Sequence, residues 1–165
     1  MNIVFVRNNL RLLAGMAAFA VFLMSFALQA ADDSYELIPP RPDFLTAKIE
    51  IISQNGSRHL FDVELARTIH QQRYGLMYVK SLESDRGMLF EHKPPRSAVM
   101  WMKNTYVSLD MLFADIRGRV VHIHENAKPL SQSLIRTPMP VRYILEVPAG
   151  TVKRLGLGLG DRIAF

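Results

Sequence analysis

Hydrophobic and polar residues alternate along much of the chain with the period of two that is typical of half-buried β-strands. Between residues 47 and 53, apolar side chains at every second position are separated by Lys48 and Glu50. Asn55-Gly56 follows, and this pair favours a tight hairpin turn because both residues tolerate positive φ. The alternation resumes over residues 59–65, which we expect to form the partner strand of the hairpin.

One short helix stands out against this β pattern. Thr68 is suited to cap its first turn, and Gln71 lies in capping-box position three residues later. Gly75 favours the left-handed conformation that ends a helix, and a second helical turn is expected over residues 152–155. The other apolar runs are short and bounded by turn residues, and they predict strands at 88–90, 97–102, 107–115, 120–127, 143–147 and 159–165.

So many short strands with so little helix favour a mainly β domain, an antiparallel sandwich or barrel. Prolines set two expected interruptions. Pro94-Pro95 is expected to break the chain after the strand at 88–90. The segment from Pro129 to Pro140 is expected to be the longest irregular loop, and long loops in compact domains are often functional.

Residues 1–30 have the three parts of a secretory signal peptide. Arg7 and Arg11 give a basic start, residues 12–28 are almost wholly apolar, and small residues follow, which predicts cleavage after Ala30. The alternative is an uncleaved anchor, because the apolar run approaches the roughly 18 residues that span a bilayer. We therefore expect a periplasmic or secreted protein, with membrane contact only through this segment and only if it is uncleaved.

Residues 31–46 are expected to be a linker, because Pro39-Pro40 and Pro42 favour extended backbone. The rest of the chain, residues 47–165, has a normal size for one domain with a single hydrophobic core.

Charge and cysteine content narrow the classes of function. The chain has 20 Lys and Arg against 15 Asp and Glu, and removal of Arg7 and Arg11 leaves 18 against 15. This excess is too small and too scattered to indicate nucleic-acid binding. The chain has no cysteine, which excludes thiol catalysis, disulfides and cysteine-ligated metal sites.

The segment 99–113 brings polar side chains into an otherwise apolar stretch: Lys103, Asn104, Thr105 and Asp110. One interpretation is structural, because Asn and Thr side chains bond to backbone in bends and a buried Asp110 needs a partner such as Lys103. The other is a cleft in which Lys103 and Asn104 bind an anionic or hydroxylated ligand and Asp110 orients them or acts as a base.

Trp101 is the only tryptophan, and Met100 and Met102 flank it. Large apolar side chains of this kind most often fill a core. The two other interpretations are an aromatic platform for a sugar or a cation, and a thioether site for Cu(I).

Glu146 lies in an apolar strand, and Asp161 follows a glycine near the end of the sequence. Either could join Asp110 in a paired-carboxylate site, although turn chemistry is the preferred interpretation for Asp161. His122 and His124 share one face of a strand, but the glutamate that usually completes such a metal site is missing four or five residues later. The sequence therefore predicts neither a metal nor a cofactor.

Three groups of motifs follow one another along the chain: Gly75-Leu76-Met77 with Gly87-Met88-Leu89-Phe90, then Trp101-Met102-Lys103-Asn104-Thr105 with Leu109-Asp110, then Leu145-Glu146 with Ala149-Gly150 and Gly160-Asp161. Together they resemble the DUF192 family, small bacterial and archaeal proteins that often carry a signal peptide and have no assigned function. The resemblance implies a β-sandwich of jelly-roll type with one or two short helices, and it implies no reaction. One position departs from the family pattern, because Val79 stands where an arginine usually follows the Gly-Leu-Met motif.

The sequence thus predicts an exported cell-envelope domain that binds a small polar ligand or an envelope glycan without catalysis. The candidate binding residues are Trp101, Lys103, Asn104, Thr105, Asp110 and Glu146. The alternative is a carboxylate-dependent hydrolase acting on an envelope substrate, with Asp110 as base and Lys103 stabilising charge.

Overall fold

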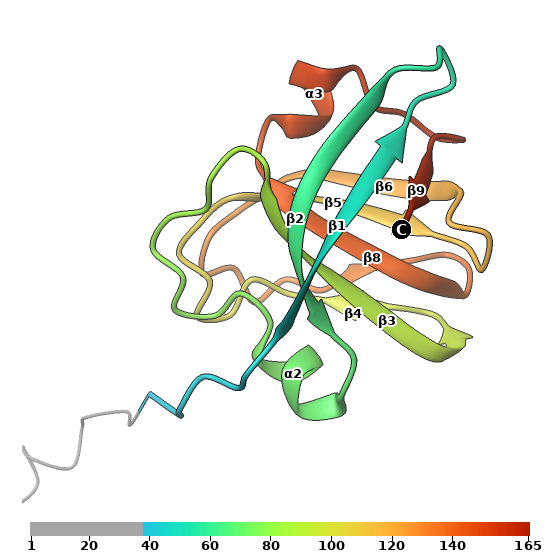
Figure 1. Cartoon of the computed structure of the whole chain (residues 1–165). Helices are drawn as coiled ribbons and strands as arrows, with labels where there is room; N and C mark the ends of the chain where they lie inside the picture. Colours follow the sequence, from blue (N-terminus) through green and yellow to red (C-terminus); the bar gives the residue numbers. More distant parts are fainter. Residues whose placement is uncertain (1–37) are drawn as a thin grey trace, which may run out of the picture. The chain divides into compact units, whose positions relative to one another are not determined.

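A computed structural model describes residues 38–165 of the chain (Figure 1). The expected signal peptide, its cleavage after Ala30 and residues 31–37 of the expected linker lie outside the described residues. Neither helix within residues 38–165 has the length and apolar composition that a membrane span requires. The elements are β1 (Leu45–Ile52), β2 (Arg58–Ala66), α2 (Ile69–Tyr74), β3 (Arg86–Arg96), β4 (Val99–Met100), β5 (Leu109–Ala114), β6 (Val120–Ala127), β7 (Ile135–Arg136), β8 (Val141–Pro148), α3 (Thr151–Leu155) and β9 (Arg162–Ala164).

Seven strands form one sheet in the order β6–β5–β8–β3–β2–β1–β9, and β4 and β7 form a separate two-stranded ribbon. Every neighbouring pair in the large sheet is antiparallel except β2 and β3. The sheet curls, so that the segment around β9 returns to the start of β6 (Figure 1). There the amide of Val120 donates to the carbonyl of Asp161 at 2.8 Å, and the amide of Ile163 donates to the carbonyl of Gly118 at 2.8 Å.

The central strands β3, β5 and β8 are buried on both faces. Successive side chains of a strand point to opposite faces, and those of β8 enter two different apolar clusters. Leu145 joins a cluster that also draws on β1, β2, β6 and β9 and is enclosed by the curl. Ile144 joins the cluster on the other face, which Leu76, Ala98 and Met102 cover from outside the sheet.

The structure confirms the mainly β class and the predicted helix start. The hydroxyl of Thr68 accepts from the amide of Gln71 at 3.2 Å, and the side-chain oxygen of Gln71 accepts from the amide of Thr68 at 3.0 Å. Gly75 ends the helix at a φ of 52°, and Gly56 turns the predicted hairpin at a φ of 86°. Local capping and turn chemistry therefore decided these two features.

Other expectations were wrong in detail. β3 continues through Pro94-Pro95 to Arg96, because its register with β8 shifts beyond Glu91 and the prolines occupy the irregular part of the pairing. The strand expected at 97–102 is reduced to the two residues of β4, and β7 forms inside the expected loop. The single curled sheet, with its parallel pair, does not confirm a jelly-roll sandwich.

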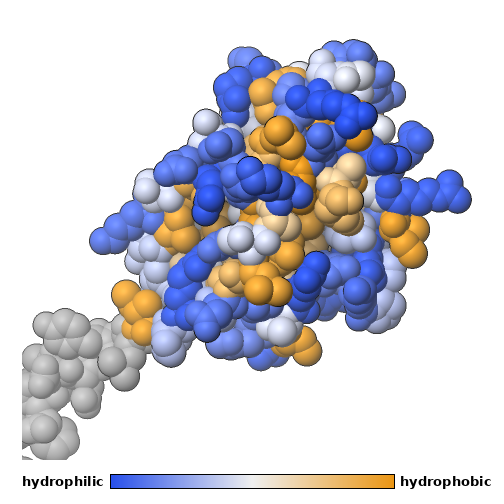
Figure 2. Space-filling model, viewed as in Figure 1, coloured by the Kyte–Doolittle hydropathy of each residue, from blue (hydrophilic) through white to orange (hydrophobic). Residues whose placement is uncertain are grey.

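Several large hydrophobic side chains remain exposed on the folded domain. Figure 2 shows hydrophobic patches that interrupt the hydrophilic surface on one face. A group of exposed residues in the sequence segments around β4 and β7 includes Val99, Trp101, Tyr106, Leu130 and Leu134. Single exposed apolar residues are normal, but a group of them on neighbouring segments needs an explanation.

Candidate functional site

A small cavity of about 60 Å³ lies where three distant parts of the chain meet. Residues 75–77 reach it from the end of α2, Trp101, Lys103 and Thr105 reach it from the segment after β4, and Glu146 reaches it from β8. Each of these parts belongs to a different one of the three motif groups on which the family resemblance rests. Their convergence on one cavity makes it the candidate functional site.

Glu146 is the buried acid of this cavity. It is 4% exposed, and Leu145 and Val147 beside it belong to the opposite face of the sheet. No hydrogen bond or ion pair joins its carboxyl group to any other residue in the described part of the chain. Burial raises the pKa of Glu146 to about 8, so the side chain holds its proton at neutral pH and can donate a hydrogen bond.

The β3 strand approaches Glu146 unusually closely. Met88 is its register partner, and a Cβ added at Gly87 would lie 2.4 Å from the backbone oxygen of Glu146. The glycine therefore lets β3 and β8 come together beside the buried acid.

An aromatic ring and cations lie on the more exposed side of the cavity. Trp101 is 44% exposed, and the Nζ atom of Lys103 lies 5.7 Å from the centre of its ring. This distance is within the range of a cation–π contact. Arg73 from α2 adds a second positive charge to the lining. The cavity thus offers a neutral donor in its depth and positive charge near its opening.

Asn104 and Thr105 shape the bend that presents Trp101 and Lys103. Asn104 has a φ of 57°, and its side-chain amide donates to the hydroxyl of Tyr78 at 2.8 Å. The backbone amide of Tyr78 donates to the carbonyl of Asn104 at 2.7 Å. Thr105 lines the cavity, whereas the contacts of Asn104 hold the bend against the segment after α2.

Asp110 lies on the other face of the sheet and is fully buried. Its two carboxylate oxygens accept from the backbone amides of Asn126 and Val152, each at 2.9 Å. Val152 lies in the first turn of α3, whose cap residue Gly150 has no side chain to bond it. Asp110 therefore supplies a distant helix cap, and no ion pair joins it to Lys103 within residues 38–165.

Asp161 also accepts hydrogen bonds from backbone amides. Its carboxylate accepts from the amide of Gln54 at 3.0 Å and from the amide of Gly158 at 2.8 Å. This is the turn chemistry expected for an aspartate after glycine. The three carboxylates considered from the sequence, Asp110, Glu146 and Asp161, therefore do not meet in one site.

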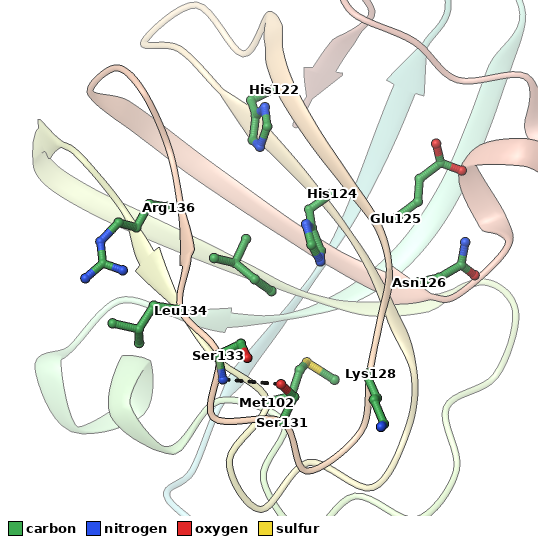
Figure 3. A pocket seen from close by; sticks show the side chains of 11 residues that line it. Met102, His122, His124, Glu125, Asn126, Lys128, Ser131, Ser133, Leu134 and Arg136 are labelled. Atoms are coloured by element: carbon green, nitrogen blue, oxygen red, sulfur yellow. Dashed lines mark hydrogen bonds between the residues drawn. The ribbon is translucent and has the colours of Figure 1, made fainter.

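The two histidines of β6 line a separate, larger pocket of about 480 Å³ (Figure 3). His122 stacks on Phe113 with ring centres 5.3 Å apart. The pocket lies between β6 and the segment 128–136, and Met102 forms part of its lining. Within the described residues, no group of three or more His, Asp or Glu side chains is placed to hold a metal ion.

Sequence reasoning missed Arg73 and the part that residues 75–77 play in the cavity. Arg73 follows a capped helix start and has no distinctive neighbours, so no local pattern marks it. Residues 75–77 carried a usable signal, because they form the first of the family motifs. Their place beside Trp101 depends on the folded chain and could not be predicted from spacing.

Comparisons with known proteins agree with this fold. A structure from Sinorhizobium meliloti 1021, provisionally described as a transcription regulator, is 44% identical, with a TM-score of 0.73 over 75% of this chain and 96% of that chain. A protein of unknown function from Novosphingobium aromaticivorans DSM 12444 is 33% identical, with a TM-score of 0.72 over 82% of this chain and 96% of that chain. No curated protein matches the chain. The model of the DUF192 family, described as "Uncharacterized ACR", matches residues 50–165, and the chain belongs to this family.

Proposed function

We propose that this chain is an exported cell-envelope domain that binds a small polar ligand, or the end group of an envelope glycan, without turning it over. The binding site is the cavity formed by Trp101, Lys103, Thr105 and Glu146. Export is expected from the basic and apolar composition of residues 1–30.

The observation that carries this proposal is the buried and unpartnered carboxyl group of Glu146. A buried polar group without a hydrogen bond costs free energy, and such groups are rare in folded proteins. In this chain the carboxyl group of Glu146 has no partner among the described residues, and its oxygens reach the cavity and are not sealed in dry core, so only the contents of the cavity can satisfy it. A ligand that accepts a hydrogen bond from Glu146 would satisfy it.

The size of the cavity limits what enters. One water molecule takes up about 30 Å³ of liquid water, so a cavity of about 60 Å³ has room for only about two waters. One end of a sugar or a small acid fits this space, whereas a whole glycan does not. Trp101 and the cations near the opening would then contact the part of the ligand that remains outside.

A hydrolase with paired carboxylates has less support. Glu146 is the only acidic residue among the described residues that line the cavity, and Asp110 and Asp161 already bond to backbone amides. The raised pKa of Glu146 would suit a general acid, but no second carboxylate is present to act as nucleophile or base.

The description of the Sinorhizobium relative as a transcription regulator has little support as a function for this chain. The two helices in the described part of this chain have 6 and 5 residues, and one lies beside the cavity while the other is capped by buried Asp110. Neither resembles a helix that enters the major groove of DNA.

Fluorescence of the single tryptophan tests the proposal directly. The full chain is titrated with glucose, N-acetylglucosamine and glucuronic acid while the emission of Trp101 and the melting temperature are recorded. We expect a saturable emission change with one of these probes. The same probe should stabilise the fold by about 2.7 kcal/mol at a hundredfold excess over its Kd.

The pH dependence of binding identifies the role of Glu146. We expect the affinity of the wild type to fall as the pH rises through about 8, because ionised Glu146 can no longer donate. Glu146→Gln keeps a donor and should bind without this loss, and Glu125→Gln, which alters an exposed acid outside the cavity, should behave as wild type. If no probe changes the emission of Trp101, the proposal fails, and if a probe is consumed, the hydrolase alternative replaces it.

A further inference from the structure

The β4–β7 ribbon exposes an apolar outer face. Met100 and Ile135 are register partners, and both pack against the core cluster beneath the ribbon. Alternation along the strands then turns Val99, Trp101 and Leu134 outward, and these side chains are 55%, 44% and 48% exposed. In Figure 3, Leu134 and Arg136 lie on the segment that forms one wall of the larger pocket, and His122 and His124 lie on the strand across from it.

Two further exposed residues extend this face. The amide of Leu130 donates to the carbonyl of Thr105 at 3.1 Å, and the amide of Met102 donates to the carbonyl of Ser131 at 2.9 Å. These bonds join the segments 99–106 and 128–136, so Tyr106 and Leu130 lie next to the ribbon. Leu130 has a φ of 61°, a conformation that leucine rarely adopts, yet its side chain is exposed. Packing does not explain why leucine occupies this position.

The charge on this face has one sign. Residues 92–109 and 126–145, which contain both segments, include no Asp or Glu. Lys103, Lys128 and Arg136 lie on them and form no ion pair within residues 38–165. Glu125 immediately precedes the second stretch; it is exposed and lines the larger pocket together with Lys128 and Arg136, but it forms no ion pair with either. The face therefore combines exposed apolar side chains with unpaired positive charge.

We propose that this face, formed by Val99, Trp101, Tyr106, Leu130 and Leu134 with Lys103, Lys128 and Arg136, docks on a membrane surface that contains anionic phospholipids. Tryptophan and tyrosine are favoured at the boundary between headgroups and acyl chains, where one end of the side chain is apolar and the other is hydrated. Leucine and valine enter the acyl region, and lysine and arginine pair with anionic headgroups.

A nucleic acid fits this face less well. Val99, Leu130 and Leu134 can neither bond to phosphates nor read base edges, and they are 55%, 54% and 48% exposed. Burial of their apolar surface would contribute in a membrane and would contribute little against a duplex.

The single tryptophan again supplies the test, since it lies on the proposed face. The full chain is mixed with vesicles of phosphatidylcholine alone or with added phosphatidylglycerol, and the acyl chains are brominated to quench buried tryptophan. We expect the emission of Trp101 to shift to the blue and to be quenched only when phosphatidylglycerol is present. Added salt should weaken this response, because it screens the attraction between lysine and headgroup.

Variants outside the cavity separate this proposal from ligand binding. Lys128→Glu should weaken vesicle binding by about fivefold or more, and Leu134→Asp by about tenfold or more. Neither residue lines the cavity, so both variants should still bind a sugar or acid probe as wild type does. Ile116→Asp and Arg117→Glu are matched controls in the exposed β5–β6 turn, at the opposite end of those strands, and should bind vesicles normally.

Four outcomes would overturn the proposal. The first is that the chain floats with the vesicles while the emission of Trp101 stays unchanged, which would assign vesicle binding to another part of the chain. Neutral vesicles give the same response as anionic ones. Leu134→Asp and Lys128→Glu bind as tightly as the controls. A DNA duplex, and not the vesicles, changes the emission, which would make the face a nucleic-acid interface.

Discussion

The side chain of Glu146 links the candidate site to the stability of the fold. Its pKa is about 8 in the folded chain and near 4.5 when it is exposed. Below about pH 4.5 both states hold the proton, and this residue adds no pH dependence. Between about 4.5 and 8 the unfolded state releases a proton that the folded state keeps, so the contribution of Glu146 to the free energy of unfolding falls by about 1.4 kcal/mol per pH unit. Glu146→Gln should remove this fall, as measured by urea unfolding from pH 5 to pH 9.

His92 opposes this trend at lower pH and must be considered in the same experiment. Burial, with the charge of Arg96, lowers the pKa of His92 to about 4, so stability falls as the pH drops from about 6.5 towards 4. The two residues together predict a plateau between about pH 4.5 and 6.5. Glu125→Gln serves as the control for Glu146→Gln. An alkaline fall that persists in Glu146→Gln would contradict the assignment of that fall to the buried acid.

Asp110 has a structural role, because its carboxylate accepts hydrogen bonds from two backbone amides. Asp110→Asn replaces one accepting oxygen with an NH₂ group. That group faces one of the two backbone N–H groups, so the NH₂ group and that N–H both lack an acceptor. We expect a loss of about 3 kcal/mol in urea unfolding, because the position is fully buried. Asp115→Asn is a matched control, since Asp115 accepts from the amides of Arg117 and Arg119 in an exposed turn. Loss of ligand binding in a fully stable Asp110→Asn protein would contradict this account.

At the residue scale, the sequence indicated several residues that line the cavity but not which side chains contact one another. Trp101, Lys103, Thr105 and Glu146 were all candidates, and the structure brings these four together. The expected partnership of Lys103 with Asp110 is absent from the described residues, because the two side chains lie on opposite sides of a sheet. A pattern of residue types reveals which groups need partners, but the partners are set by strand register.

At the scale of elements, the approach of β3 to β8 positions Glu146 and can be tested at Gly87. Gly87→Ala would place a methyl group 2.4 Å from the backbone oxygen of Glu146, and the two strands would have to separate. We expect a loss of about 2 kcal/mol and weaker binding of a probe in the cavity.

Gly158→Ala is the control for this substitution. A Cβ at Gly158 meets nothing within 4 Å, and its backbone needs no left-handed conformation. We expect its stability to change by less than about 0.5 kcal/mol. Equal effects of the two substitutions would show that the close strand approach is not the cause.

Elements with strong local signals were predictable, and those made by long-range pairing were not. The capping box before α2 and the Gly56 hairpin are decided within a few residues, and both were correct. β4 and β7 contain two residues each and exist only because they pair with one another. No pattern in the sequence of β2 or β3 indicates that these two strands pair in parallel, so the topology of the sheet could not be predicted.

At the scale of the whole domain, the closure of the sheet depends on β9. Ile163 is buried in the cluster inside the curl, and β9 covers the outer edge of β1 while it bonds to the segment before β6. A chain that ends at Asp161 should lose more than about 3 kcal/mol in urea unfolding and expose two strand edges. Hydrogen exchange should rise first in β1 and at the start of β6.

Phe165→Ala is the matched control for this truncation. Phe165 is exposed and contacts Tyr143 through its ring, but it forms no part of the sheet. We expect it to cost less than about 1 kcal/mol. Rapid exchange confined to β9 itself in the shortened chain would argue that the rest of the sheet closes without it.

The curl also has a consequence for the time at which the domain can fold. As the ribosome makes the chain, β1 emerges early, but its second neighbour is synthesised more than a hundred residues later. Until that point, two strand edges stay open and the enclosed cluster stays incomplete. A nascent chain of this design stays short of its final packing until β9 has been made, and an incompletely packed chain is what a translocation pore can accept.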